Sequence, residues 1–196
     1  MSPTRRPAKV SVHPLTPGRW PDLVKLFGPS GACAGCWCMW WRMPNAAFAA
    51  RRGADNRRAL QRYVHAGNVP GLLAYRGAEP VGWVAVEPRA AYSRLTRSRL
   101  LAPVDEKPVW SVTCFYVDPE HRGRGLTRAL IEAAVRHARA RGAPAVEAYP
   151  VAVKSRVDDD VVYHGAASTF AKLGFREVAR RSPSRPVVRK GTGRRG

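Results

Sequence analysis

The sequence predicts an α/β fold, because segments in which apolar residues alternate with a strand-like period of two are followed by segments with helical spacing. Three observations support this prediction. A strand-like run at 9–16 leads into helical segments, and two apolar runs at 71–75 and 81–87 are separated by a short turn sequence. A β-rich run at 109–117 leads through a glycine-containing loop into a long helix. The length of 196 residues is typical of one domain.

The first half of the domain begins with that strand and continues with helices. Thr16 followed by Pro17 is a helix start, and apolar residues at helical spacing extend this helix to about Gly28. A second helix follows, with a break near Gly53. Its apolar positions are Phe48, Leu60, Tyr63 and Val64.

The second half is richer in strands. After the hairpin at 71–87, residues 88–107 are polar and irregular, so we expect a surface excursion there. The expected elements that follow are a strand at 109–117, a helix at 126–141, a strand at 145–149, a short helix at 165–173 and closing strands at 175–179 and 186–189. We expect the domain to span 9–190, with disordered basic tails at 1–8 and 191–196.

The composition restricts the location and the partners of the chain. No run approaches the roughly 20 apolar residues of a membrane helix, and Met1 to Val10 lacks the apolar centre of a secretory signal. We therefore expect a cytoplasmic protein without a membrane partner. The formal net charge of +20 favours binding of an anion such as a phosphate-bearing cofactor. Because the arginines are spread over the whole chain, we expect no specific nucleic acid.

Three of the four cysteines lie close together, at Cys33, Cys36 and Cys38, and Cys114 lies far away in the sequence. A zinc site commonly takes its four ligands from two separated pairs, and no second pair of Cys or His has fitting spacing. We therefore expect no metal, and small apolar thiols packed in a tight turn.

The loop at 122–127 carries the clearest chemical signal. Gly123 and Gly125 let backbone N–H groups approach an anion closely, and the start of the following helix adds a partial positive charge. Arg122, Arg124 and Arg128 surround the loop with cations. No Gly-Lys-Ser/Thr follows, which excludes a P-loop, and the G-x-G-x-x-G of a dinucleotide fold is absent. The pattern indicates a pyrophosphate cradle.

From Val117 to Leu126 the sequence V-D-P-E-H-R-G-R-G-L resembles the acetyl-CoA-binding motif of the GNAT superfamily of N-acetyltransferases. Thr127 departs from the last position of that motif. The resemblance implies a mixed, mostly antiparallel sheet of six or seven strands with about four helices, and acetyl-CoA as co-substrate. It also implies a bulged strand whose backbone pairs with the pantetheine arm, with the Phe115 N–H polarising the thioester carbonyl. The implied cofactor-binding residues are Phe115, Tyr116, Val117, Arg122, Gly123, Arg124, Gly125, Leu126, Thr127 and Arg128.

A second stretch, Tyr163 to Phe175, resembles the last helix of the same family and the start of its penultimate strand. Where many members have a tyrosine that protonates the departing thiolate, this chain has Phe170. Phenylalanine cannot donate a proton. Tyr163, two helical turns earlier, is therefore the candidate acid, with a packing role or water as the alternatives.

Amine acetylation also needs a base. Some members carry a carboxylate at the strand position that Ser111 occupies here. The candidate bases are Glu87, at the end of its strand, and Glu147, on the strand after the helix at 126–141. The alternative for both is a solvated or ion-paired carboxylate. The candidate acceptor wall consists of Trp37, Trp40 and Trp41, which could equally be packing residues, and Asp158–Asp160 could attract a cationic acceptor.

We therefore predict transfer of an acetyl group from acetyl-CoA to a primary amine by direct attack in a ternary complex. The acceptor is a small-molecule or peptide amine of unknown identity, and the oligomeric state stays open, with a homodimer among the options. Two alternatives are an acyl-CoA-binding module without turnover and a nucleic-acid-binding protein.

Overall fold

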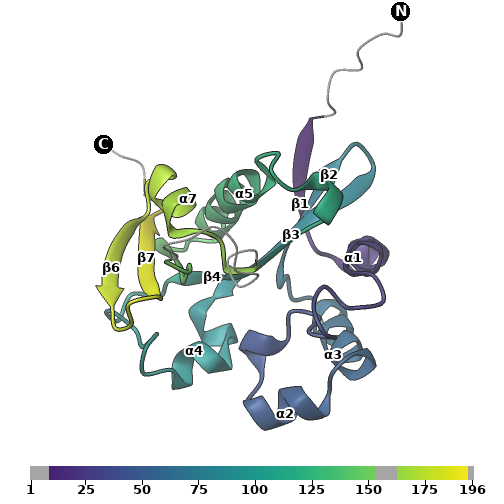
Figure 1. The fold of residues 1–196 in the computed structure, drawn as a ribbon, viewed down its shortest axis with the longest axis horizontal. Coiled ribbons are helices and arrows are strands. Elements are labelled where there is room, and N and C mark those ends of the chain that lie inside the picture. Colours follow the sequence, from purple (N-terminus) through teal and green to yellow (C-terminus); the bar gives the residue numbers. More distant parts are fainter. Residues whose placement is uncertain (1–8, 153–162, 194–196) are drawn as a thin grey trace, which may run out of the picture.

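The computed structural model describes residues 9–152 and 163–193, which form a seven-stranded sheet flanked by helices (Figure 1). The strand order is β1-β2-β3-β4-β5-β7-β6, and only the β4–β5 pair is parallel. The strands are β1 (Val10–Pro14), β2 (Gly71–Arg76), β3 (Glu79–Pro88), β4 (Trp110–Val117), β5 (Ala145–Ala148), β6 (Arg176–Arg180) and β7 (Pro186–Gly191). This arrangement confirms the predicted mostly antiparallel α/β fold.

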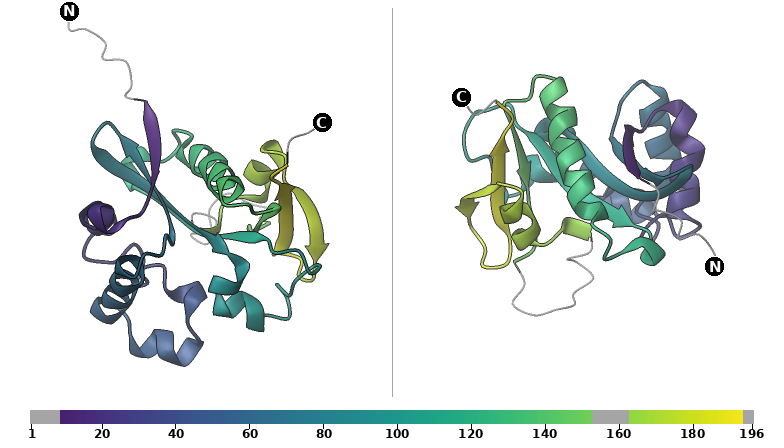
Figure 2. Two further views of the ribbon diagram at one scale, coloured as in Figure 1. Left: turned by 180° about the vertical axis from the view of Figure 1, so that it is seen from behind. Right: turned by 90° about the horizontal axis from the view of Figure 1, so that it is seen from above.

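Six α-helices lie within the described residues, and they are divided between the two faces of the sheet (Figures 1 and 2). The helices are α1 (Trp20–Phe27), α2 (Asn45–Ala50), α3 (Ala54–His65), α4 (Ser93–Arg97), α5 (Leu126–Ala140) and α7 (Ala167–Lys172). On one face α5 buries its apolar stripe against β2, β3 and β4. On the other face α1, α3 and the segment between them cover Leu73, Trp83 and Ala85.

The sheet opens between β4 and β5. These strands pair over three residues only, Trp110 to Val112, whereas β4 continues to Val117 against β3. The β3–β4 register shifts between Ala85, opposite Cys114, and Val86, opposite Val112. Thr113 is therefore the extra residue of a β-bulge, which bends β4 away from β5 at that point. This is the bulged and splayed strand that the family resemblance implies.

Two segments differ from the predictions. The stretch 88–107 is not wholly irregular, because it contains the 3-10 turn Arg89–Ala91 and α4 and buries Tyr92, Leu95 and Leu101. The predicted tail 191–196 is also partly wrong: Gly191 pairs with Ala145 in β7, and Thr192 is buried and donates to the Ala143 carbonyl. The predicted count of about four helices is low because α4 was missed and the second helix is split into α2 and α3 at Gly53.

Within residues 9–152 and 163–193, every helix is too short or too polar to cross a lipid bilayer.

Candidate functional site

The predicted pyrophosphate cradle is an open pocket of about 390 Å³ at the start of α5. Gly123 and Gly125 have φ angles of 72° and 77°, in the left-handed region that favours glycine. A Cβ added at either glycine would meet no protein atom within 4 Å. The backbone of the loop therefore borders open space. The Arg122 side chain is held at this loop by a 3.3 Å hydrogen bond from its Nε to the Val117 carbonyl.

The strand next to the cradle exposes backbone groups toward the opening in the sheet. The Val117 carbonyl accepts from Arg122 and thus faces away from β3. Because backbone polar groups alternate in direction along a strand, the Phe115 N–H and carbonyl point the same way. The Phe115 ring itself is buried, 6.1 Å from the Phe170 ring. The Phe115 N–H, for which the described residues supply no partner, thus borders the gap between β4 and β5.

A second pocket, of about 250 Å³, lies on the other side of β4. Four separate pieces of chain contribute to its lining: the segment 32–41, the α2 region, β4 and the residues just before α7. The lining residues are Ala32, Cys33, Ala34, Cys36, Cys38, Trp40, Trp41, Phe48, Arg52, Cys114, Tyr163 and His164. We name this the thiol pocket, because it brings all four cysteines of the chain together.

The wall of the thiol pocket is a tightly wound loop. Four non-glycine residues have positive φ angles there: Ala32, Ala34, Trp37 and Cys38. A Cβ at Gly35 would lie 2.4 Å from the Gly53 nitrogen, so this loop packs directly on the α2–α3 junction. The Gly35 carbonyl accepts from the Gly53 N–H and from the Asn56 amide. Such strained backbone is held only where surrounding contacts determine it.

The thiols of the pocket differ in chemistry. The Cys114 thiol and the Trp83 indole, whose Nε1 lies 3.0 Å from the Cys38 sulfur, donate to Cys38 and lower its pKa. As the donor of that pair, Cys114 has a raised pKa. Burial raises the pKa of Cys36 to about 12. Among the residues that the structure describes, no three Cys, His, Asp or Glu side chains converge as metal ligands would.

Tyr163 and His164, just before α7, line the thiol pocket together with the 32–41 loop. The His164 Nδ1 lies 3.1 Å from the carbonyl of Thr113, the bulge residue, and its ring contacts Trp41 at 5.8 Å. Sequence reasoning identified Tyr163 but missed His164. No local pattern in the sequence marks His164, because its place depends on how the chain before α7 lies against β4: a Cβ at Gly165 would be 3.5 Å from the Phe115 ring.

The three tryptophans of the predicted acceptor wall lie in two different places in the structure. Trp40 and Trp41 line the thiol pocket, and Trp40 is 40% exposed. Trp37 is instead buried in the helix-packing core, where it contacts Trp20 at 6.1 Å and Phe27 at 5.6 Å. For Trp37 the structure therefore supports the packing alternative over the acceptor role, because its ring packs on Trp20 and Phe27 of α1. Asp158–Asp160 lie outside the described residues.

The first predicted base, Glu87, is part of a buried cluster. Its carboxylate is ion-paired with Arg42 and accepts a 2.8 Å hydrogen bond from the Tyr63 hydroxyl. The Arg42 guanidinium also lies over the rings of Tyr63 and Tyr92, at 4.9 and 4.8 Å. Glu87 does not line the thiol pocket.

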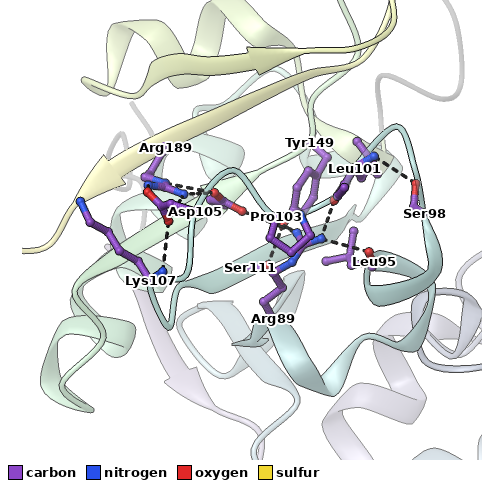
Figure 3. Close-up of polar contacts among 12 residues, drawn as sticks. Arg89, Leu95, Ser98, Leu101, Pro103, Asp105, Lys107, Ser111, Tyr149 and Arg189 are labelled. Atoms are coloured by element: carbon purple, nitrogen blue, oxygen red, sulfur yellow. Dashed lines mark hydrogen bonds and ion pairs between the residues drawn. The ribbon is translucent and has the colours of Figure 1, made fainter.

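The second predicted base, Glu147, is 1% exposed and is engaged from several directions. Figure 3 labels its partners Arg89, Tyr149 and Arg189. Arg189 donates two hydrogen bonds of 3.0 and 2.7 Å to Oε1, and Arg89 lies 3.6 Å from Oε2. The Tyr149 hydroxyl lies 3.1 Å from Oε2 and 2.8 Å from the Ser111 hydroxyl. Burial and Glu147 raise the pKa of Tyr149, which therefore stays protonated. This network joins β4 to β5 just before they separate.

Three features suit a transferase that binds two substrates: the open pocket at the start of α5, the bulged strand beside it, and the second pocket across that strand. The profile of the acetyltransferase (GNAT) family matches residues 37–175. The chain therefore belongs to this family, whose class is the acetyl-CoA-dependent acyltransferases, as the sequence motif predicted.

The relatives support the same fold. An uncharacterized N-acetyltransferase of Methanocaldococcus jannaschii is 30% identical over 99 residues, a match that covers 50% of this chain but only 35% of the archaeal protein. The PaiA N-acetyltransferase of Thermoplasma acidophilum, solved with coenzyme A, has a TM-score of 0.54 at 13% identity and covers 93% of this chain and 99% of its own. A polyamine N-acetyltransferase of Drosophila melanogaster that forms N-acetylagmatine has a TM-score of 0.53 at 17% identity, covering 92% and 98%.

Proposed function

We propose that the protein transfers the acetyl group of acetyl-CoA to a primary amine by direct attack in a ternary complex. The observation that carries this proposal is the position of the thiol pocket, which meets β4 at Cys114, beside the outward-facing N–H of Phe115. A donor bound in the cradle and an amine in the thiol pocket would approach the same residues of β4 from opposite sides. Direct transfer requires such proximity.

The cofactor would be held mainly by backbone groups. The N–H groups of the loop at Gly123 to Gly125 and the start of α5 would bind the pyrophosphate, with Arg122 adding charge. The backbone of Phe115 to Val117 would pair with the pantetheine arm. The Phe115 N–H would donate to the thioester oxygen and stabilise the negative charge that develops as the amine attacks.

His164 is our candidate base. Its Nδ1 faces the Thr113 carbonyl and must donate to it, so the lone pair of the neutral ring lies on Nε2. Histidine is the side chain whose unperturbed pKa is closest to neutrality, which suits removal of a proton from an ammonium group. We do not assign this role to Glu87 or Glu147, because arginines already bind both carboxylates.

Tyr163 is our candidate acid. It lines the thiol pocket beside His164, whereas Phe170, at the position where the family often has tyrosine, is fully buried between the rings of Phe115 and Phe175. A thiolate leaving group is only modestly basic, so water could protonate it more slowly without this phenol.

The test is acetyl transfer itself. The protein would be incubated with radiolabelled acetyl-CoA and a panel of neutral, anionic and cationic amines, and labelled product would be quantified with release of free CoA. We expect one class of amine to be acetylated with stoichiometric CoA release. Binding of CoA without transfer to any amine would contradict the proposal and favour an acyl-CoA-binding module.

A further inference from the structure

A third pocket, of about 470 Å³, adjoins the thiol pocket, because Trp40 and Trp41 line both. Its other walls come from the start of α2, from α4 with the residues just after it, and from Arg185 before β7. Three arginines line it, Arg94, Arg97 and Arg185, and its described lining contains no carboxylate. We name it the arginine pocket.

Arg94 is held in the arginine pocket by groups that carry no negative charge, as far as the described residues show. Arg94 Nε donates to the Trp40 carbonyl, Nη1 donates to the Asn45 side chain, and the guanidinium stacks on the Trp40 ring at 3.6 Å. These contacts fix the orientation of the group, and no carboxylate of the described residues forms an ion pair with it. A stacked and oriented guanidinium is suited to binding planar anionic oxygens.

Two polar atoms at this pocket lack a partner. Arg94 Nη2 and the Ser93 hydroxyl are both buried, and the described part of the chain supplies neither with a hydrogen-bond partner. Unsatisfied buried donors cost free energy, on the order of 1–3 kcal/mol each, unless a ligand or water binds them. Both are donors on residues that line one pocket, so a ligand in this pocket that carries acceptor oxygens is suited to satisfy them.

The thiol pocket has matching chemistry. Its described lining is aromatic, aliphatic and sulfur-containing, and its one permanently charged side chain is Arg52. A ligand with several positive charges would therefore meet guanidinium groups in both pockets and no described carboxylate. An amine joined through an apolar body to an anion would find a partner for each part.

We propose that the acceptor is such an amine: its apolar body lies against Trp40 and Trp41, and a carboxylate or phosphate at its far end binds Arg94 and Ser93 in the arginine pocket. This inference rests on the proposed acetyl transfer and adds the class of acceptor. The anionic group would lie in a different pocket from the reacting nitrogen, so it would select the substrate without taking part in the chemistry.

The test uses four phenethylamines that differ only in the para substituent: hydrogen, carboxylate, phosphate or aminomethyl. We expect kcat/KM to be at least tenfold higher for one of the two anionic compounds than for the neutral or cationic one. The better of the carboxylate and the phosphate identifies the anion. In Arg94→Ala the ratio of anionic to neutral kcat/KM should fall to near one.

Two further variants keep the test decisive. If Arg94→Ala does not fold, the exposed Arg97→Glu should also lower the ratio, since it reverses a charge at the surface of the same pocket. Arg99→Ala is the control, because Arg99 carries the same charge in the same segment but does not line the pocket. Acetylation without an anionic preference, on these compounds or on a wider panel, overturns this inference and leaves the proposed function intact. Failure to acetylate any amine overturns both.

Discussion

Two glycine-containing loops border the two pockets of the proposed site, and their glycines have opposite surroundings. At Gly123 and Gly125, in the cofactor cradle, an added Cβ would point into open space. At Gly31 and Gly35, in the wall of the thiol pocket, it would lie 2.3 Å from the Trp37 indole and 2.4 Å from the Gly53 backbone. The first pair leaves room for a ligand, and the second pair lets the protein pack on itself.

The difference shows how each pocket obtains its shape. The cradle is a short continuous segment whose backbone we propose to bind the cofactor, so we expect its side chains to matter mainly through charge. The thiol pocket is assembled from distant segments, and its chemistry comes from side chains such as His164 and Cys114. We therefore expect changes on the acceptor side to affect turnover, and changes in the cradle to affect cofactor affinity.

The largest effect is expected on the acceptor side, at His164. In His164→Asn the amide can still donate to the Thr113 carbonyl, but the group that would accept the proton is lost. We expect kcat to fall by about 10² to 10⁴, the usual contribution of a general base, with little change in CoA affinity. The acidic limb of the pH–rate profile should disappear as well. Wild-type turnover in His164→Asn would remove the histidine from the mechanism.

The next largest effect is expected in the cradle, on CoA affinity. Valine at Gly125 must adopt a left-handed backbone, and its side chain would occupy space reserved for the ligand, so we expect at least a tenfold weaker CoA affinity by calorimetry. Arg122→Ala should weaken CoA in the same direction.

Gly142 provides a matched control for this change. It lies at the other end of α5 with the same φ of 77° and equally open surroundings. Gly142→Val should therefore lose similar stability but keep its CoA affinity. Equal CoA affinity in the two valine variants would contradict the assignment of the cradle.

The two sides also differed in how well the sequence predicted them. The cradle depends on consecutive residues, so its glycines, arginines and helix start could be recognised directly. The thiol pocket depends on the tertiary placement of Cys114 and His164, which no local pattern contains. The same limit applies to Glu147: its arginine partners, Arg89 and Arg189, are far away in the sequence, so burial in ion pairs could not be foreseen.

A smaller effect is expected for Tyr163. Its removal as an acid leaves water as the proton donor, so Tyr163→Phe should slow turnover by at least about tenfold while acetyl-CoA binds almost as before. The measurement is kcat alongside the Kd for CoA. The deficit should shrink with a better leaving thiol, because such a thiolate needs less protonation. Unchanged kcat in this variant would exclude Tyr163 as the acid.

The smallest effect concerns stability on the cofactor side, at His137 in α5. This ring is 8% exposed, packs on Trp110 at 5.7 Å, and has Nδ1 2.9 Å from an Arg141 nitrogen. Because arginine can only donate, Nδ1 must accept and the ring must be neutral. Burial, with the Arg141 charge, lowers the pKa of His137 to about 4.

The sign of the pH effect follows from the two states of the chain. In the unfolded chain a histidine binds its proton near pH 6.5, whereas folded His137 does so only near pH 4. Its contribution to stability is therefore complete above about pH 6.5, falls as the pH drops from there to about 4, and then levels off. Between pH 7 and 5 this loss amounts to about 2 kcal/mol.

His137→Leu should reduce the pH dependence of the unfolding free energy by that amount, as measured by urea denaturation at both pH values. For each variant, the unfolding free energy at pH 5 is subtracted from that at pH 7, so a loss of packing that does not depend on pH cancels. The exposed His65→Leu serves as the control. An undiminished pH dependence in His137→Leu would show that the loss of stability in acid arises elsewhere.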